Sequence, residues 1–268
     1  MNRSERASRY GIGALIAVFA GWFILPILIG LGLPGPTDAD RTADGEFYRT
    51  VRGVLLGEVM LVSISLLWCI AVITFLALWP RVLVDSKPTR RWVVIVPIIT
   101  VIPCLLFTRY DAFLDIGPGF FAATVLMVLV IGASEELLFR GITVELLRNR
   151  VSEGWVAFIS TMLFGLAHLM NSLAAGVLNL PQVLSAIVVG YLLYLTRRSL
   201  RLIIFPILLH AIMDLFEFSH IGTADGASFY NFLFNLALVI VVLACGRLIS
   251  PRRPSTLNAP DSDQRLGA

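Results

Sequence analysis

GFFAATVLMVLVIGASEELLFR, which runs from Gly119 to Arg140, is apolar enough to cross a bilayer except where Glu135 and Glu136 stand side by side. A carboxylate near the bilayer centre costs about 2.5–3.5 kcal/mol on insertion scales, so such residues mark functional sites by default. Two adjacent glutamates followed by an arginine therefore predict a functional site inside a membrane helix.

The composition of the whole chain indicates a membrane protein. Of its 268 residues, 57% are hydrophobic and 15% are charged, and the mean hydropathy is +0.85. Soluble domains contain about 25% charged residues. Because helices satisfy their own backbone hydrogen bonds in lipid, the fold class we expect is an all-α, polytopic transmembrane bundle.

Apolar runs of bilayer length predict about eight helices in a single transmembrane domain over residues 1–250. The runs lie near 10–33, 54–79, 92–107, 119–147, 155–170, 183–196, 202–216 and 229–249. Four of them, which begin near 92, 155, 183 and 202, are short for a bilayer. Seven helices are therefore the alternative.

Basic residues alternate between the two membrane faces when eight helices are assumed, which the positive-inside rule interprets as a cytoplasmic side with both termini on it. The residues on that side are Arg3, Arg6, Arg9, Arg81, Lys87, Arg90, Arg91, Arg148, Arg150, Arg197, Arg198, Arg201, Arg252, Arg253 and Arg265. This distribution accounts for the net charge of +3 without a nucleic-acid partner. The polar segment 251–268 is expected to be a disordered cytoplasmic tail.

Lysine is nearly absent from the chain. Lys87 is the only lysine, against 20 arginines, which hints at a GC-rich bacterial genome. The expected location is therefore a bacterial cell membrane, with the lipid bilayer and a membrane-associated protein or peptide as partners.

Two further predicted helices carry ionisable residues among apolar neighbours. The fifth contains Phe164 and His168, and the seventh contains His210 and Asp214. Residues four apart lie on one helix face, as Glu136 and Arg140 also do. Three helices, the fourth, fifth and seventh, can therefore point polar groups into one cavity. Helical rise places them in a shared layer near the bilayer middle, provided that the fourth helix continues to about Leu147.

The residue types in this cavity indicate the chemistry. A buried carboxylate together with an imidazole can activate water at neutral pH, and a second imidazole can stabilise an oxyanion. This arrangement hydrolyses an amide without a protein nucleophile. Glutamate, histidine and aspartate are also zinc ligands, so zinc is the alternative to a site without a cofactor.

Each polar residue has a simpler interpretation when it is taken alone. Glu136 and Arg140 can form an ion pair near the interface, His168 can be a packing histidine, and Asp214 can lie near the outer interface. Ser134 is expected to be a small helix-packing residue, because the glycine that follows a rhomboid-like serine is missing. The sequence also lacks the H-E-x-x-H zinc motif and the G-x-G-D aspartyl motif.

The three motifs together resemble one family. Glu135 to Arg140 is similar to its E-E-x-x-x-R motif, Phe164 to His168 to its F-x-x-x-H motif, and His210 to Asp214 to its H-x-x-x-N/D motif. The family is that of the CAAX proteases and bacteriocin-processing (CPBP) enzymes, which includes the type II CAAX prenyl proteases. The resemblance covers about Phe120 to Phe216, and we expect a catalytic core over 119–216.

The resemblance implies an eight-helix intramembrane endopeptidase whose prenyl-protein members cleave behind a lipidated cysteine. It assigns Glu135 as the base that activates water, with assistance from His168. Glu136 would orient the site with Arg140, while His210 and Asp214 would face the oxyanion.

Asparagine is commoner than aspartate at the last position of the third motif. Asp214 would therefore be protonated, orient His210 or act as a metal ligand. Members of the family have been described both as metalloproteases and as metal-free glutamate enzymes, and we favour the metal-free form. A bacterial substrate need not be prenylated, so the substrate expected is a membrane-associated peptide or protein, with or without a lipid.

Two functions of other classes compete with hydrolysis. A non-catalytic bacteriocin-immunity or partner-binding protein could keep the same scaffold with an idle site. A proton-coupled transporter could use the same buried carboxylates, but no inverted repeat is visible and the short spans disfavour it.

Overall fold

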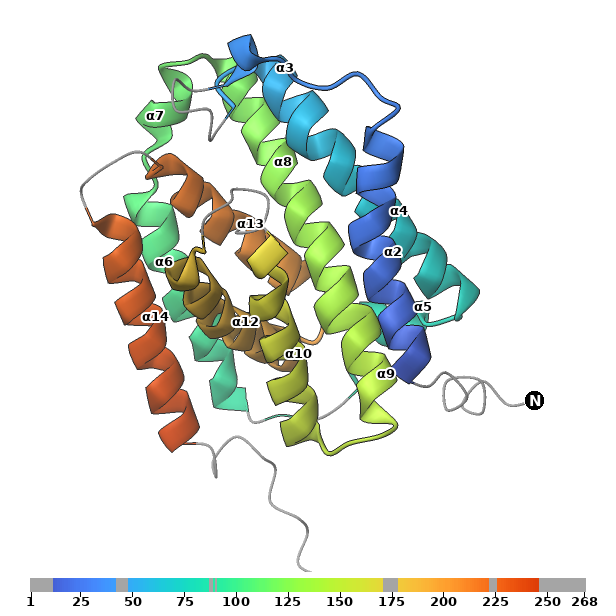
Figure 1. The fold of residues 1–268 in the computed structure, drawn as a ribbon. Helices are drawn as coiled ribbons and strands as arrows, with labels where there is room; N and C mark the ends of the chain where they lie inside the picture. The colour runs from blue at the N-terminus through green and yellow to red at the C-terminus, as the bar shows by residue number, and fades with distance from the viewer. Residues whose placement is uncertain are drawn as a thin grey trace, which may run out of the picture.

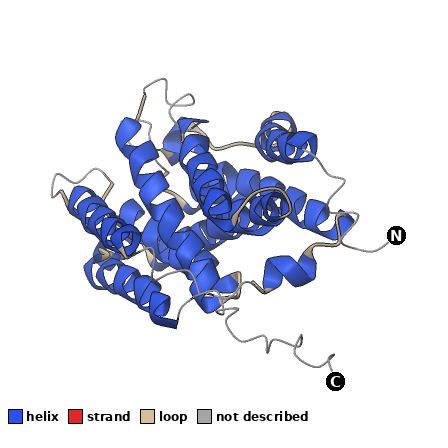
Figure 2. Ribbon diagram, turned by 90° about the horizontal axis from the view of Figure 1, so that it is seen from below, coloured by secondary structure: helices blue, strands red, loops and turns tan. Residues whose placement is uncertain are grey.

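The computed structural model describes residues 12–41, 48–86, 89, 91–170, 178–221 and 226–245. Regular structure in these ranges is helical throughout, as Figure 2 shows. Their only β contacts are two isolated antiparallel bridges, Arg41 with Tyr48 and Val84 with Leu202. The predicted all-α fold class is confirmed, while the tail expected over 251–268 lies outside the described residues.

Each of the eight predicted segments contains a helix where it is described. In chain order they contain α2 (Ile12–Gly30); α3 (Val51–Gly53), η2 (Val54–Val59) and α4 (Met60–Phe75); η3 (Arg91–Val94) and α6 (Ile95–Phe107); α8 (Pro118–Glu136), η4 (Leu137–Thr143) and α9 (Val144–Arg148); α10 (Glu153–Ala167); α12 (Leu180–Leu200); α13 (Ile204–Ser219); and α14 (Ala227–Ala244). Short elements between them are η1 (Asp38–Asp40), α5 (Trp79–Leu83) and α7 (Tyr110–Leu114).

Five described helices are long and apolar enough to cross a membrane, so the protein is an integral membrane protein. They are Ile12–Gly30, Val51–Phe75, Pro118–Arg148, Leu180–Leu200 and Ala227–Ala244. The helices Trp92–Phe107, Glu153–Ala167 and α13 are shorter. Three of the four runs identified as short from the sequence are thus short helices, whereas α12 reaches 21 residues by extending through Leu200.

The second predicted helix is wrong at its end, because the chain leaves the helix before Trp79. Helix α4 ends at Phe75, and Ala77 adopts a left-handed conformation with φ of 54°. Pro80 then lies in the first turn of the separate helix α5. Proline lacks an amide hydrogen and is favoured in a first helical turn, where that hydrogen has no partner within the helix, so a helix restarts there.

The long helix of α8, η4 and α9 runs through the middle of the molecule (Figure 1). Helices α2 and α4 pack together on one side of it, and α13 packs against it on another. Helix α12 lies between α10, α13 and α14 and contacts all three. The motif-bearing helices therefore pack around a common centre.

Close contact between α8 and α13 depends on Gly132. A Cβ atom at this position would lie only 2.9 Å from the carbonyl oxygen of Ile207. Small residues allow helix backbones in membranes to approach in this way. Gly132 lies one helical turn before Glu136, and Ile207 lies about one turn before His210. The contact between them therefore brings the first and third motifs together.

The hydrophobic core surrounds the end of α8 and the start of η4. Phe139 and Phe164 are both buried in it, and their rings meet edge to face with centroids 5.1 Å apart. Edge-to-face geometry is favourable for aromatic pairs. The core therefore joins α10, which carries Phe164, to η4, which directly follows the glutamates.

Candidate active site

The first motif lies where the long helix changes its winding. Helix α8 ends at Glu136 and continues directly as a π-helical turn, η4, before α9 carries the helix on to Arg148. Every residue of η4 is buried. π-helical turns inside α-helices are frequent at functional sites. The helix thus passes Arg140 without a break, which is the condition for the depth estimated from the sequence.

A buried ion pair is formed by Glu136 and Arg140. The Arg140 Nη1 donates to Glu136 Oε1 over 2.7 Å, and these side chains are 1% and 0% exposed. The other nitrogen, Nη2, donates to the carbonyl oxygen of Gly190 over 2.8 Å. The guanidinium also lies over the ring of Phe164, 4.2 Å from its centroid. The ion pair is therefore fixed in the core and is not an exposed pair at the interface.

His210 is surrounded by carboxylates. Its Nδ1 is 3.0 Å from Glu136 Oε1, and since an ionised carboxylate only accepts, Nδ1 donates this hydrogen bond. Its Nε2 lies 3.8 Å from Glu135 Oε2 and 3.6 Å from Asp214 Oδ2. The structure thus brings the first and third motifs together around one imidazole ring.

His168 lies beside this group without a hydrogen bond to it. Its Nδ1 is 2.9 Å from the Phe164 carbonyl oxygen, and because a carbonyl only accepts, Nδ1 carries the proton. In a neutral ring Nε2 is then the basic nitrogen. The Phe164 ring touches both imidazoles, with centroids 5.0 Å from His168 and 5.6 Å from His210. Phe164 therefore contacts both histidines of the site.

Two carboxylate oxygens of the site have no hydrogen-bond partner. Oε2 of Glu135 and Oε2 of Glu136 are both buried and unpaired among the described residues. The side chain of Glu135 is 16% exposed and that of Asp214 is 24% exposed, whereas Glu136 is sealed. A buried unpaired polar atom in a native protein calls for an explanation, such as a catalytic role. Glu135 combines an unpaired oxygen with an open edge.

The described side chains do not form a ready zinc site. Within the described residues, no group of three or more His, Cys, Asp and Glu side chains is arranged to hold a metal ion. Oε1 of Glu136 is occupied by Arg140 and His210, and Nδ1 of His210 by Glu136. A catalytic zinc takes three protein ligands.

Some contacts of the site were not foreseen from the sequence. Ser134 was expected only to pack, yet its hydroxyl accepts a hydrogen bond from Trp22 Nε1 over 2.9 Å. Gly190 supplies a carbonyl to Arg140, and a Cβ atom there would lie 3.0 Å from the Phe164 ring. A glycine in the apolar run of α12 is the only signal that the sequence offers for this contact.

The segment that contains the three motifs matches one family model. Residues 117–216 match the family model described as Type II CAAX prenyl endopeptidase Rce1-like. This Rce1-like segment begins just before α8 and ends within α13, so it contains all three motifs. The resemblance inferred from the motifs is confirmed over these residues. No curated protein and no solved structure matches the chain.

The Rce1-like segment supports, at the level of the family, a CAAX-type protease that acts in a membrane. The helices α2 to α7 and α14 lie outside the match. They include three of the five helices that are long enough to span a bilayer. The family match therefore covers the helices that carry the site, and the remaining helices lie outside it.

Proposed function

We propose that the protein is an intramembrane endopeptidase that hydrolyses a peptide bond in a membrane-associated protein or peptide. The observation that carries this proposal is the position of Glu135, which has a buried unpaired oxygen and an open edge beside His210. Its location in the Rce1-like segment supports the same reaction class.

In the proposed mechanism Glu135 acts as the general base. Its carboxylate takes a proton from a water molecule, which attacks the carbonyl carbon of the scissile bond. Nε2 of His168, the basic nitrogen of that ring, assists in holding the water. The protonated Glu135 then returns the proton to the leaving amine as the C–N bond breaks. No covalent bond to the protein is formed.

Glu136 and Arg140 position the other imidazole of the site. Arg140 fixes Glu136 through a buried ion pair, and Glu136 accepts the Nδ1 proton of His210. The opposite nitrogen, Nε2, is then directed to the edge where Glu135 and Asp214 lie. In its protonated form Nε2 donates to the oxyanion, a contact that such sites use to stabilise the transition state.

Asp214 is assigned to orienting His210 rather than to contacting the oxyanion. It lies one helical turn beyond the histidine, with its Oδ2 3.6 Å from Nε2. An ionised aspartate only accepts hydrogen bonds, so it cannot itself stabilise an oxyanion. The negative charge of Asp214 instead attracts the imidazole ring of His210 from the open side of the site.

The test is cleavage of membrane-anchored peptides by the purified, detergent-solubilised protein. The panel contains each peptide with a prenyl group, with an acyl group and without a lipid, which also identifies the substrate class. Wild type is compared with Glu135→Gln and His168→Ala, each with and without a zinc chelator. Glu58→Gln serves as the matched control, because Glu58 lies in η2 of another spanning helix.

The proposal predicts cleavage that is lost in Glu135→Gln and His168→Ala, retained in Glu58→Gln and insensitive to the chelator. Cleavage that the chelator abolishes and zinc restores would overturn the metal-free mechanism. A Glu135→Gln variant that protects cells from a bacteriocin as well as wild type does, with no cleavage by either, would favour the immunity function. Proton-coupled uptake into vesicles that the same variant abolishes would favour a transporter.

The end of the bundle rich in arginine, to which Arg148 and Arg197 belong, is proposed to face the cytoplasm. The positive-inside rule places the cytoplasm on the side of the membrane where short loops are rich in arginine and lysine. The native Cys245, which directly follows α14, is tested with a membrane-impermeant thiol reagent in intact cells to check the assignment, since the other two cysteines are buried. Labelling only after the membrane is opened is the expected result.

A further inference from the structure

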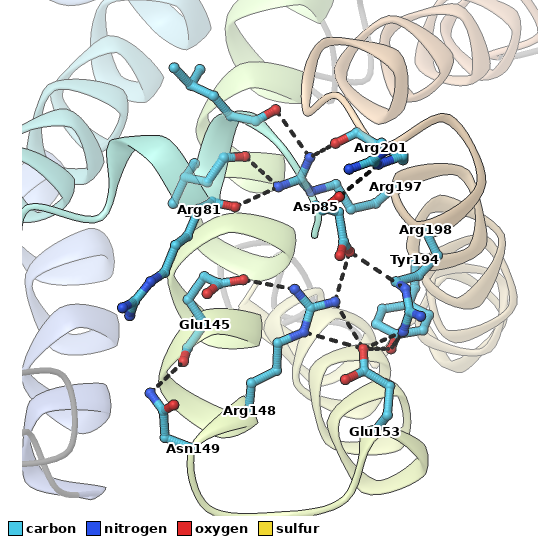
Figure 3. Close-up of polar contacts among 12 residues, drawn as sticks. Arg81, Asp85, Glu145, Arg148, Asn149, Glu153, Tyr194, Arg197, Arg198 and Arg201 are labelled. Atoms are coloured by element: carbon cyan, nitrogen blue, oxygen red, sulfur yellow. Dashed lines mark hydrogen bonds and ion pairs between the residues drawn. The ribbon is translucent and has the colours of Figure 1, made fainter. Parts of the chain in front are cut away.

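A second group of charged residues lies at the arginine-rich end of the bundle, outside the active site. Figure 3 shows that Arg148 at the end of α9 points into a ring of carboxylates. Its Nη2 is 2.7 Å from Asp85 and 2.9 Å from Glu153, and its Nη1 is 2.8 Å from Glu145. One guanidinium therefore joins three acidic side chains.

Glu153 links α10 to α12 within the same group. Its Oε1 accepts a hydrogen bond from the Tyr194 hydroxyl over 2.7 Å and forms an ion pair with Arg198. Arg198 Nε also lies 3.5 Å from Asp85 Oδ2. Hydrogen bonds to charged groups are stronger than neutral ones. Asp85, Arg148, Glu153, Tyr194 and Arg198 are called the terminal cluster below.

Arg197 attaches the segment that carries Asp85 to the end of α12. Its guanidinium donates to the carbonyl oxygens of Arg81, Val82 and Leu83, which form the end of α5, and to that of Arg201. A cation at the end of a helix satisfies carbonyls that have no partner within it.

Backbone contacts hold the same segment in place. Asp85 N donates to Arg201 O over 2.7 Å, and Ile203 N donates to Leu83 O over 3.1 Å. These two bonds surround the isolated bridge between Val84 and Leu202. Asp85 is fully buried. Its carboxylate is therefore held at a fixed point between the ends of α9 and α12.

Each helix that carries an active-site motif is held by this arrangement. The long helix with Glu135 and Glu136 contributes Arg148, and α10, which leads to His168, contributes Glu153. Helix α12 contributes Tyr194 and Arg198 and turns directly into α13 with His210. At a rise of about 1.5 Å per residue, Arg148 is about 18 Å from Glu136 along its helix. The terminal cluster therefore touches no reacting group.

We propose that the terminal cluster is a positioning device for the active site, in which Asp85 and Glu153 fix how far the three motif-bearing helices are displaced along one another. Asp85 holds the long helix and α12 in register through Arg148 and Arg198, and Glu153 holds α10 in register with both. A shift of one helix along another moves Glu135 relative to His210. This inference rests on the proposed function, because its consequence is a change in the rate of hydrolysis.

The experiment measures the displacement of the helices directly. Spin labels are placed on cysteines at Leu126 of α8 and Leu208 of α13, which are 45% and 42% exposed. The background carries Cys245→Ser, since the other two cysteines are buried. Asp85→Asn is expected to shift or broaden the distance distribution between the labels. Asp111→Asn, which alters an exposed ion pair at Arg109, is the matched control and should leave it unchanged.

The kinetic readout distinguishes positioning from a general loss of folded protein. A displacement of about 1 Å far from the chemistry can cost up to about a hundredfold in rate. Asp85→Asn should therefore lower kcat by about tenfold to a hundredfold without changing KM, as expected when only transition-state interactions are weakened. Unchanged label distances, or a loss confined to KM, would overturn the proposal.

A milder variant protects the experiment against misfolding of Asp85→Asn. Tyr194→Phe removes only the hydroxyl that binds Glu153 and Arg198, and labels at Phe158 of α10 and Leu208 then report on α10. Its control is Tyr110→Phe, which removes an exposed hydroxyl bonded to Leu105 O over 3.0 Å. The label distances decide the inference even where wild type cleaves no peptide, so a failure of the proposed function remains distinguishable.

Discussion

The active site and the terminal cluster are both buried groups of charges, but they differ in how completely the charges are paired. In the active site three carboxylates, Glu135, Glu136 and Asp214, surround one imidazole with a single arginine nearby. Two carboxylate oxygens there have no hydrogen-bond partner among the described residues. In the terminal cluster no carboxylate oxygen is among the buried unpaired atoms of the described residues.

This difference separates charges that hold the fold from charges that are available for chemistry. A buried charge that is fully paired costs little further free energy, whereas an unpaired one is expensive and persists where function requires it. Natural proteins accept such costs at active sites. We therefore expect substitutions in the terminal cluster to reduce stability more than activity. Substitution of an unpaired active-site carboxylate should reduce activity more than stability.

The largest effect on stability is expected inside the active site itself, at its one completed ion pair. Arg140→Met leaves Glu136 buried without its guanidinium and should lower the free energy of unfolding by about 3–5 kcal/mol. Unfolding in mixed detergent and SDS micelles measures the loss. The double variant Glu136→Gln, Arg140→Met should recover much of it. A single variant as stable as wild type would show that the ion pair does not support the fold.

A smaller loss is expected where α8 and α13 approach each other. Gly132→Ala places a methyl group 2.9 Å from a backbone oxygen of α13. The backbone of a packed helix cannot move aside as the end of a flexible side chain could. Overpacking of this kind costs about 1–3 kcal/mol. Gly154→Ala is the control, because no atom lies within 4 Å of a Cβ there. Equal unfolding free energies for both variants would contradict close helix contact at Gly132.

Removal of one hydroxyl from the terminal cluster should cost less again. Tyr194→Phe leaves the ring in place and deletes the bond donated to Glu153 and the weaker one accepted from Arg198, for an expected loss of about 1–1.5 kcal/mol. The same unfolding titration measures it. Glu153 keeps Arg148 and Arg198 as partners, so a loss as large as that of Arg140→Met would mean that the cluster is not redundant.

The smallest effect is expected at an exposed ion pair, which provides the baseline for the comparison. Asp111 is 63% exposed and lies 3.4 Å from Arg109. Exposed pairs contribute about 0–1 kcal/mol because water screens them. Asp111→Asn should therefore unfold almost as wild type does. A larger loss would show that charge alone, rather than burial and pairing, determines the cost.

Much of the bundle is predictable from hydropathy, and the first and third motifs from helical spacing. Glu136 with Arg140 and His210 with Asp214 do form pairs four residues apart. The spacing does not reveal the π-helical turn around Arg140, since both windings keep the pair on one side of the helix. It also does not indicate that the ring of Phe164 contacts both His168 and His210.

The terminal cluster could not be predicted from periodicity, because its contacts join residues far apart in the sequence. Asp85 and Arg148 are 63 positions apart, and Glu153 and Tyr194 are 41 apart. In the sequence Arg148 and Arg198 indicated only which face of the membrane they occupy. The packing of α5, α9, α10 and α12 joins these charged residues into one network.

The most direct test of this account compares two glutamates, one from each group. Cleavage of a membrane-anchored peptide and thermal unfolding are measured in parallel for Glu135→Gln and Glu153→Gln. We predict that Glu135→Gln loses about 10²–10⁴-fold in kcat, the usual contribution of a general base, while its Tm stays at or above that of wild type. Glu153→Gln should lower Tm and reduce kcat by a smaller factor than Glu135→Gln does, up to about a hundredfold, because α10 is displaced. Cleavage by Glu135→Gln at the wild-type rate would contradict the account.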